Sequence, residues 1–118
     1  MSILFIFNRQ PYDSTDVTWN GLRLAITLKD KGEDVRIFLM NDSVDMARES
    51  CVPPEGYDQD LKQMLKKLIA SGVPVEVCGT CMARCGMYVN EPYYEGANKS
   101  TMNKLAEWVQ ESDKILTF

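Results

Sequence analysis

The sequence contains no histidine, no long apolar run and no cluster of basic residues. Without histidine the chain lacks the commonest general base and the commonest zinc ligand, so its chemistry must depend on thiols, carboxylates, Arg, Lys or Tyr. The longest apolar run, ILFIF at 3–7, is far shorter than the roughly 20 residues that cross a bilayer. The net charge is −4, and lysines and arginines are scattered, unlike the basic patch of a nucleic-acid binder. We therefore expect no membrane and no nucleic-acid partner.

The first residues also lack the features of a secretory signal. MSILFIFNRQ has neither a charged n-region nor a long apolar h-region, so we expect the cytoplasm, where thiols are kept reduced. A disulfide framework built from the four cysteines is not expected there. A length of 118 residues with 45% hydrophobic and 25% charged residues predicts one globular domain over 1–118.

Short apolar runs alternate with amphipathic segments along the chain. Four nearly continuous apolar runs are typical of parallel strands covered on both faces; they are 3–7, 35–40, 73–78 and 114–118. A weaker fifth run lies near 95–98. The segments with helical periodicity are 17–31, 58–71 and 101–112. This alternation predicts an α/β layered domain with a parallel sheet.

The periodicity also predicts which helical residues face the core. In 17–31 the core stripe comprises Val17, Gly21, Leu24, Ala25 and Leu28. A second apolar stripe on the opposite side comprises Trp19, Leu22 and Ile26. A second stripe indicates either deep burial or contact with another subunit, and we interpret it as an oligomer interface. In 101–112 the core residues by spacing are Met102, Leu105, Ala106 and Val109.

Three of the four cysteines lie in VCGTCMARCG, residues 77–86. The strand at 73–78 should deliver Cys78 to the carboxyl edge of the sheet, where open α/β folds place their sites. Gly79 permits a sharp turn, and Thr80 is a good N-cap for a short helix. Cys78 would then precede a helix N-terminus and Cys81 would lie in its first turn, where the positive end of the helix dipole stabilises a thiolate. Arg84 adds a permanent cation nearby in the sequence.

Four interpretations of this segment remain open. The cysteines are small buried apolar residues, which is the default for Cys51; or Cys78, Cys81 and Cys85, with Cys51 as a fourth ligand, hold a metal. The spacing C-x2-C-x3-C matches neither the usual zinc pairing nor the common ferredoxin spacings. The third interpretation is a redox dithiol, and the fourth is a carrier whose thiolate takes up a sulfur atom and passes it on. No organic cofactor is expected, because neither G-x-G-x-x-G nor a Walker sequence occurs.

Other polar and aromatic residues have weaker functional indications. Asn8, Tyr12 and Asp13 follow the first strand and either line a pocket or, as we favour, serve in turns and caps. The stretch MYVNEPYYEG at 87–96, with Tyr88, Tyr93 and Tyr94, forms either a lid over the cysteines or a packed loop, and the sequence does not decide.

The cysteine segment and several other stretches of the sequence resemble a known family. GVPVEVCGTCMARCG at 72–86 resembles the signature of the DsrE/DsrF-like proteins. The resemblance extends over nearly the whole chain, through PYDSTDVTWNGLRLA, VRIFLMNDSVDMA, GYDQDLKQMLKKL and LAEWVQESDKILTF. It implies a three-layer α/β/α fold of Rossmann/flavodoxin-like architecture with a five-stranded, mainly parallel sheet. It also implies assembly into homotrimers or hexamers, which would account for the second stripe of the first helix.

The resemblance further implies roles for individual cysteines. In the sulfur-relay members a cysteine at the end of the third strand carries a persulfide, and Cys78 stands at that position. Cys81 matches a second cysteine that is present in one branch of the family and absent from some relay subunits. An Arg-Gly pair often closes this segment, whereas here Cys85 stands where the arginine is common and Arg84 lies one residue earlier. This departure makes a disulfide from Cys85 to Cys78 or to Cys81 conceivable.

Together these observations predict a small cytoplasmic sulfur-transfer protein. Cys78 would be the acceptor thiolate and Cys81 a resolving or second acceptor thiol, with Thr80, Arg84 and Cys85 in supporting roles. Its partners would be copies of itself and sulfur donor and acceptor proteins. The alternative is a cysteine-ligated metal protein or a dithiol redox protein.

Overall fold

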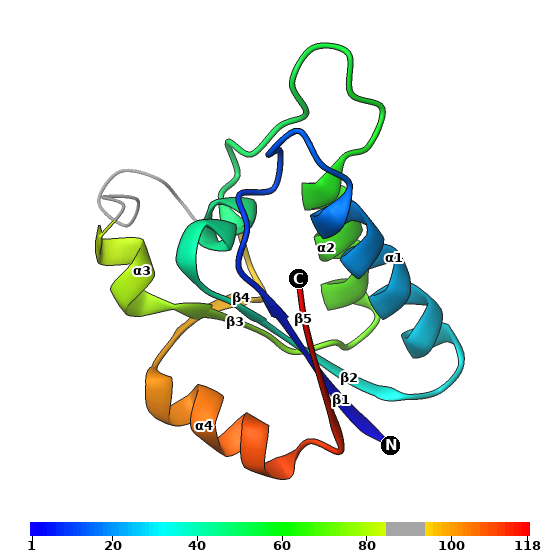
Figure 1. Cartoon of the computed structure of the whole chain (residues 1–118), viewed down its shortest axis with the longest axis vertical. Coiled ribbons are helices and arrows are strands. Elements are labelled where there is room, and N and C mark those ends of the chain that lie inside the picture. Colours follow the sequence, from blue (N-terminus) through cyan, green and yellow to red (C-terminus); the bar gives the residue numbers. More distant parts are fainter. Residues whose placement is uncertain (85–93) are drawn as a thin grey trace.

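The fold is built on a five-stranded sheet in which every pair of neighbouring strands is parallel (Figure 1). The computed structural model describes residues 1–84 and 94–118. The strand order is β4-β3-β2-β1-β5. The strands are β1 (Ser2–Phe7), β2 (Asp34–Leu39), β3 (Val75–Cys78), β4 (Ala97–Ser100) and β5 (Lys114–Thr117). The predicted parallel sheet is confirmed, and the weak fifth run is a strand that begins two residues later than expected.

Helices cover both faces of this sheet, which confirms the three-layer α/β/α arrangement. Helices α1 (Val17–Asp30) and α2 (Leu61–Ala70) lie on one face, and α4 (Met102–Glu111) lies on the other (Figure 1). The short helix α3 (Gly79–Arg84) and the 3₁₀ turn η1 (Asn41–Ala47) follow β3 and β2 at the carboxyl edge of the sheet. Within residues 1–84 and 94–118, no helix has the length and apolarity needed to cross a membrane.

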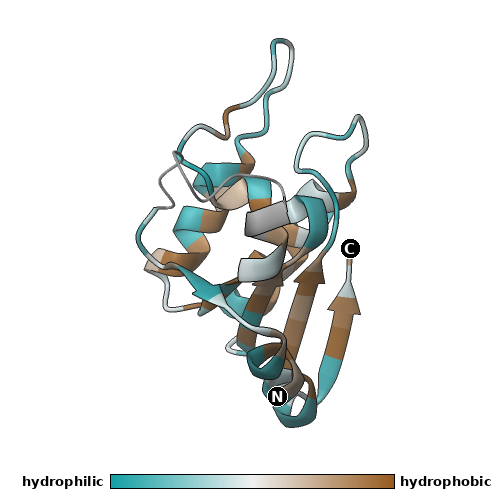
Figure 2. Cartoon of the chain, turned by 90° about the vertical axis from the view of Figure 1, so that its left-hand side faces the viewer, coloured by the Kyte–Doolittle hydropathy of each residue, from teal (hydrophilic) through white to brown (hydrophobic). Residues whose placement is uncertain are grey.

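Strands β1 and β2 are mostly hydrophobic in Figure 2 and largely buried, whereas β4 is more polar and more exposed. On the α1 side, the rings of Phe5 and Phe7 stack with their centroids 6.2 Å apart. On the opposite side, Phe38 of β2 meets Trp108 of α4 edge to face, with ring centroids 6.3 Å apart. The second contact holds α4 against the sheet, while the first forms the aromatic surface of β1 that faces α1.

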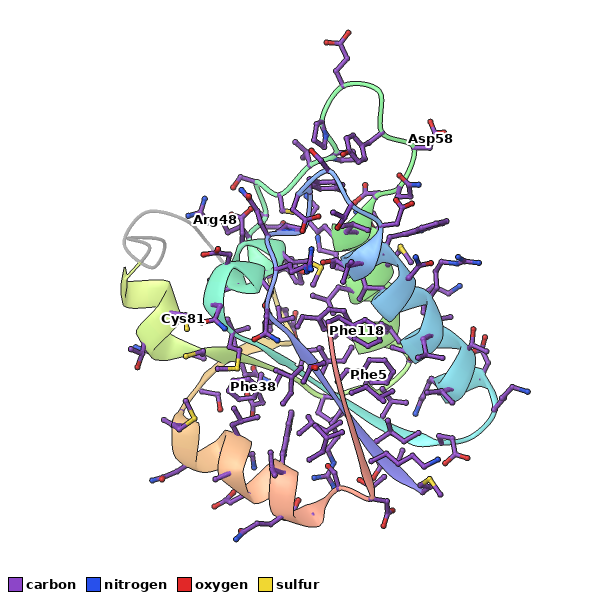
Figure 3. All side chains as sticks on the ribbon, viewed as in Figure 1. Phe5, Phe38, Arg48, Asp58, Cys81 and Phe118 are labelled. Atoms are coloured by element: carbon purple, nitrogen blue, oxygen red, sulfur yellow. The ribbon has the colours of Figure 1, made fainter. Side chains whose placement is uncertain are left out.

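Phe118 fills the space beside β1 and β5. Its ring stacks on Phe5 at a centroid distance of 5.7 Å (Figure 3) and on Phe7 at 5.6 Å. Its carbonyl accepts a hydrogen bond of 2.8 Å from the Asn8 N–H. The chain runs from β1 through β2 and β3 to β4 in one direction and then returns to β5 beside β1. Sheets of this kind often bind ligands at such a reversal, but here an aromatic side chain occupies it.

Helix α1 packs on the sheet with a face that matches the predicted one only in part: Gly21 and Ala25 are buried as expected. Leu22 is fully buried, whereas Leu24 is 38% exposed. The interface assignment is therefore wrong for Leu22, which belongs to the chain's own core. Trp19 and Ile26 are half-buried and pack against that core, and their interface role stays a prediction. Because apolar residues surround much of this helix, periodicity alone did not identify the side that meets the sheet.

Helix α4 also differs from the prediction. Leu105 and Trp108 are its buried residues, while Met102 is 60% and Val109 39% exposed. Ala106 is exposed as well. The expectation that Met102, Ala106 and Val109 lie in the core is therefore wrong. The large ring of Trp108 against Phe38 sets the orientation of the helix instead.

Gly21 lets α1 approach the aromatic cluster formed by Phe5, Phe7 and Phe118. We expect Gly21→Val to lower the free energy of unfolding by about 2 kcal/mol. A Cβ at this position would lie 2.6 Å from Phe7 Cε1 and 2.9 Å from Phe118 Cγ. Urea denaturation measures the change, with Thr27→Val at an exposed position of the same helix as the control. Equal stability of the two variants would contradict the close packing.

Candidate functional site

Three strand ends bring the candidate residues together. Phe7 of β1 pairs with Leu39 of β2, and Leu39 pairs with Val77 of β3. The three strands therefore end at nearly the same level, and the residues that follow them share one edge of the sheet. Asn8 follows β1, Asn41 opens the turn after β2, and Cys78 closes β3. This edge is the candidate functional site.

Cys78 occupies the position that the sequence assigned to Thr80. Helix α3 begins at Gly79, so Thr80 is its second residue and the N-cap prediction is wrong. The sulfur of Cys78 instead accepts the N–H of Cys81 over 3.4 Å, as an N-cap side chain does for the third helical residue. Cys78 is 5% exposed, and Thr80 is exposed. Cys78 precedes the helix and Cys81 lies in its first turn, as predicted.

Cys81 contacts a different strand end. Its sulfur accepts the backbone N–H of Asn41 over 3.1 Å, and Figure 3 shows Cys81 on the side of α3 next to η1. Cys81 is half-exposed, in contrast to Cys78. Each of the two sulfurs thus accepts a main-chain N–H, and the two residues are linked because the N–H of Cys81 points at Cys78.

Asn41 adopts an unusual backbone conformation, which a hydrogen bond of its side chain supports. Its φ of 54° lies in the left-handed region, which asparagine tolerates better than most residues. Its Nδ2 donates to Oδ1 of Asn8 over 2.9 Å. The sequence analysis named Asn8 but missed Asn41. The available signal was an asparagine placed directly after a buried strand, at the edge that also receives Cys78.

Tyr12 and Asp13 serve the loop and do not line the cysteines. The hydroxyl of Tyr12 donates to the Gln59 carbonyl and accepts the Leu61 N–H, both over 3.0 Å, which ties the loop to the start of α2. The Asp13 carboxylate accepts from the hydroxyl and the N–H of Thr15 at 2.6 and 3.1 Å. The hydroxyl bond is the main cause that lowers the pKa of Asp13. The turn-and-cap interpretation holds for both residues.

The side chain of Lys99 lies against the start of α3. A Cβ placed on Gly79 would be 2.9 Å from Lys99 Cε, so the lysine stem passes directly over the residue that follows Cys78. A hollow of about 400 Å³ opens here, lined by Gly79, Thr80, Lys99, Ser100, Thr101 and Met102. The sequence analysis did not single out Lys99, because an isolated lysine on a weak strand carries no distinguishing pattern.

Several predicted residues lie partly or wholly outside the described residues. Arg84 ends α3, but its side chain is not among those described. Cys85, Tyr88 and Tyr93 lie outside the described residues, so the disulfides and the metal set that include Cys85 stay predictions. In the part of the chain that the structure describes, no group of three or more Cys, Asp or Glu side chains could hold a metal ion.

Tyr94 follows this segment and is packed into the fold. It is 7% exposed, and its hydroxyl donates to the Met46 carbonyl over 2.6 Å. Burial raises its pKa. For this residue the packed-loop interpretation is correct.

Cys51 differs chemically from the other two described cysteines. It is 5% exposed, and burial, with a smaller contribution from the Asp45 carboxylate, raises the pKa of its thiol to about 11. Its N–H donates to the Arg48 carbonyl over 3.2 Å. Such a thiol stays protonated and unreactive at neutral pH, in agreement with the structural role expected for Cys51.

Comparison with known sequences gives one consistent result. The sequence profile of the DsrE/DsrF-like family matches residues 1–118. Protein YchN of Escherichia coli K12 is 39% identical over 118 residues, which covers 98% of this chain and 97% of YchN. An uncharacterized protein of Methanocaldococcus jannaschii is 34% identical over the full length of both chains.

Solved structures agree with the sequence comparison. The crystal structure of YchN from E. coli superimposes with a TM-score of 0.89 and 38% identity, covering 100% of this chain and 99% of that one. A conserved protein of Bacteroides thetaiotaomicron has a TM-score of 0.69 at 20% identity and covers 99% of this chain and 95% of its own. At that identity the second comparison supports the fold alone.

We expect Cys51 to resist alkylation in the folded protein. With a pKa of about 11, only about one thiol in a thousand is ionised at pH 8. Iodoacetamide labelling followed by peptide mass spectrometry should show Cys51 reacting at least about tenfold more slowly than in urea. The urea-denatured protein is the control, and equal rates in both conditions would show that Cys51 is accessible.

Proposed function

The chain belongs to the DsrE/DsrF-like family, and from this premise we propose that it is a small sulfur-transfer protein that carries sulfur as a persulfide on Cys78. The observation that carries the proposal is the pair of neighbouring thiols at the carboxyl edge of the sheet, each with a main-chain N–H on its sulfur. Such N–H groups favour the anionic form of sulfur, which is the form that attacks a donor and the form in which a persulfide is held.

The chemistry requires only thiols. A cysteine thiolate attacks the terminal sulfur of a donor persulfide or polysulfide; the new Sγ–S bond forms while the donor S–S bond breaks. The inner sulfur of the donor, which keeps the electron pair of the broken bond, leaves as a thiolate. Passing the sulfur to an acceptor thiol repeats the step in the other direction. No external oxidant or reductant enters, and no organic cofactor is needed.

The surroundings of Cys78 suit a bound persulfide. At 5% exposure the sulfur is largely shielded from solvent thiols that would remove the extra atom. Lys99 lies over Gly79 beside an open hollow, so an anionic donor would meet a cation on its approach. Cys81 is then the second thiol of the site, and donor and acceptor proteins are the expected partners in the cytoplasm.

We also propose that the chain assembles as a homotrimer or hexamer, as its family suggests. Exposed apolar residues support this: Met102 and Val109 lie two turns apart on α4. Ile115, which is 41% exposed, pairs with Leu4 of β1. Large apolar side chains that a single chain leaves exposed favour burial against another subunit.

The central test is sulfur retention. Untagged protein is treated with polysulfide, challenged with a competing thiol, alkylated and digested. We expect one extra sulfur on the peptide that contains Cys78 and Cys81, and at least about a tenfold loss of retained sulfur in Cys78→Ser, because the shielded acceptor is gone. Cys51→Ala is the matched control and should retain sulfur. Absence of sulfur in the wild type, with metal in the native mass instead, would favour the thiolate metal protein.

The assembly is tested by native mass spectrometry. We expect a trimeric or hexameric mass for the wild type and a shift to smaller species for Val109→Glu, because a buried carboxylate without a partner opposes association. Val52→Glu places the same charge at a residue that is 61% exposed on the loop after η1 and should leave the mass unchanged. A monomeric wild type would contradict the assembly, and an intact Val109→Glu oligomer would contradict this surface.

A further inference from the structure

The two thiols of the site differ in accessibility, and that difference gives them an order. Cys78 is 5% exposed and Cys81 is half-exposed. A donor that must bring its terminal sulfur into line with the attacking sulfur reaches the more exposed residue more readily. The side-chain type does not distinguish the two cysteines, but their positions do.

Asn41 makes Cys81 the better prepared of the two for the first attack. Its N–H lies 3.1 Å from the Cys81 sulfur, whereas the N–H on Cys78 lies at 3.4 Å. The shorter bond comes from a peptide group that is also held at its other end. The Met40 carbonyl, which shares that peptide group with the Asn41 N–H, accepts hydrogen bonds from the Ser43 hydroxyl over 2.7 Å and the Ser43 N–H over 3.2 Å. The Asn41 side chain is tied to Asn8 over 2.9 Å.

The left-handed backbone of Asn41 sets the direction of this N–H relative to the rest of η1, which follows it. A φ of 54° costs a residue with a side chain about 1 kcal/mol and is kept only where the surroundings determine it. The bond to Asn8 supplies that support. The unusual backbone conformation therefore lies at the residue whose N–H points at the Cys81 sulfur.

From this geometry we propose that Asn41 is a positioning residue that prepares Cys81 to receive sulfur first, and that Cys81 then passes the sulfur to Cys78. The inference rests on the proposed sulfur-carrier function. It goes beyond that function because it assigns uptake of sulfur to one thiol and retention of sulfur to the other. Asn41 acts through Cys81 and has no contact with the transferred atom in this scheme.

The two steps balance without any other reactant. Cys81 thiolate attacks the terminal sulfur of R–S–SH, giving Cys81–S–SH and the thiolate RS⁻. The Cys78 thiol then loses its proton to solvent and attacks the terminal sulfur of Cys81–S–SH. The Sγ–S bond to Cys78 forms, the bond to Cys81 breaks, and Cys81 leaves as a thiolate that is protonated again. The residues are adjacent across one helical turn, because the N–H of Cys81 already contacts the Cys78 sulfur.

The first arm of the test measures the pH dependence of Cys81 alkylation, followed by peptide mass spectrometry. Asn41→Val disfavours the positive φ and should move the N–H away from Cys81. We expect the alkylation midpoint to rise by about one pH unit and the rate at pH 7 to fall about tenfold, with Cys78 unchanged. Asn41→Gly keeps both the N–H and the φ and should stay within about twofold of the wild type. Equal profiles for the Val, Gly and wild-type proteins would overturn the role of Asn41.

The second arm measures initial rates of sulfur loading from polysulfide and does not depend on the Asn41 variants folding. We expect Cys81→Ser to load Cys78 at least about tenfold more slowly than the wild type, because the exposed acceptor is lost. Cys78→Ser should lose the sulfur that it takes up to a competing thiol at least about tenfold faster than the wild type, because the shielded thiol is gone. Wild-type loading of Cys78 in Cys81→Ser would overturn the order, as would a Cys78–Cys81 disulfide with release of sulfide in the wild type. If the wild type takes up no sulfur, the carrier function itself fails, while the alkylation profile still tests Asn41.

Discussion

The parallel register of β1, β2 and β3 is the constraint on which the site depends. The pairs Phe7–Leu39 and Leu39–Val77 bring three strand ends to one level, so that residues from distant parts of the sequence meet there. A shift of one residue in any of these pairs would exchange the faces of the strand and separate Asn41 from Cys81. Because burial of both faces of the sheet fixes this register, it also fixes where Asn41 meets Cys81.

The aromatic cluster around Phe118 determines where on this edge the site can lie. Phe118 stacks on Phe5 and Phe7 and bonds through its backbone to Ile6 and Asn8. The reversal of strand order beside β1, where many open sheets bind ligands, is thus filled by a side chain of this protein. The polar contacts of the edge lie on the other side of β1, over β2 and β3, where Asn8, Asn41 and Cys81 form a chain of hydrogen bonds.

The sequence was sufficient for the sheet because strands covered on both faces are nearly continuous apolar runs. It was less informative for helix orientation. Leu22 is buried and Leu24 exposed, although Gly21 and Ala25 are buried as their spacing predicted, because apolar residues lie on two sides of α1 and periodicity alone does not choose between them. Trp108 likewise displaces Met102 from the core of α4. The position of Cys78 before a helix followed from Gly79 and the strand, but the N–H of Asn41 could not be foreseen, because every residue except proline carries one.

The arrangement of two unlike thiols has a physical rationale. A sulfur that is open to a donor is equally open to every solvent thiol, so a single exposed cysteine gains and loses its extra atom at comparable rates. A single buried cysteine would keep the atom but gain it slowly. In the proposed scheme the accessible Cys81 takes up sulfur and the buried Cys78 retains it, while each of the two sulfurs accepts one main-chain N–H. Cys78 ends β3 and Cys81 lies in the first turn of α3, so the scheme places uptake and retention within one short segment at the edge of the sheet.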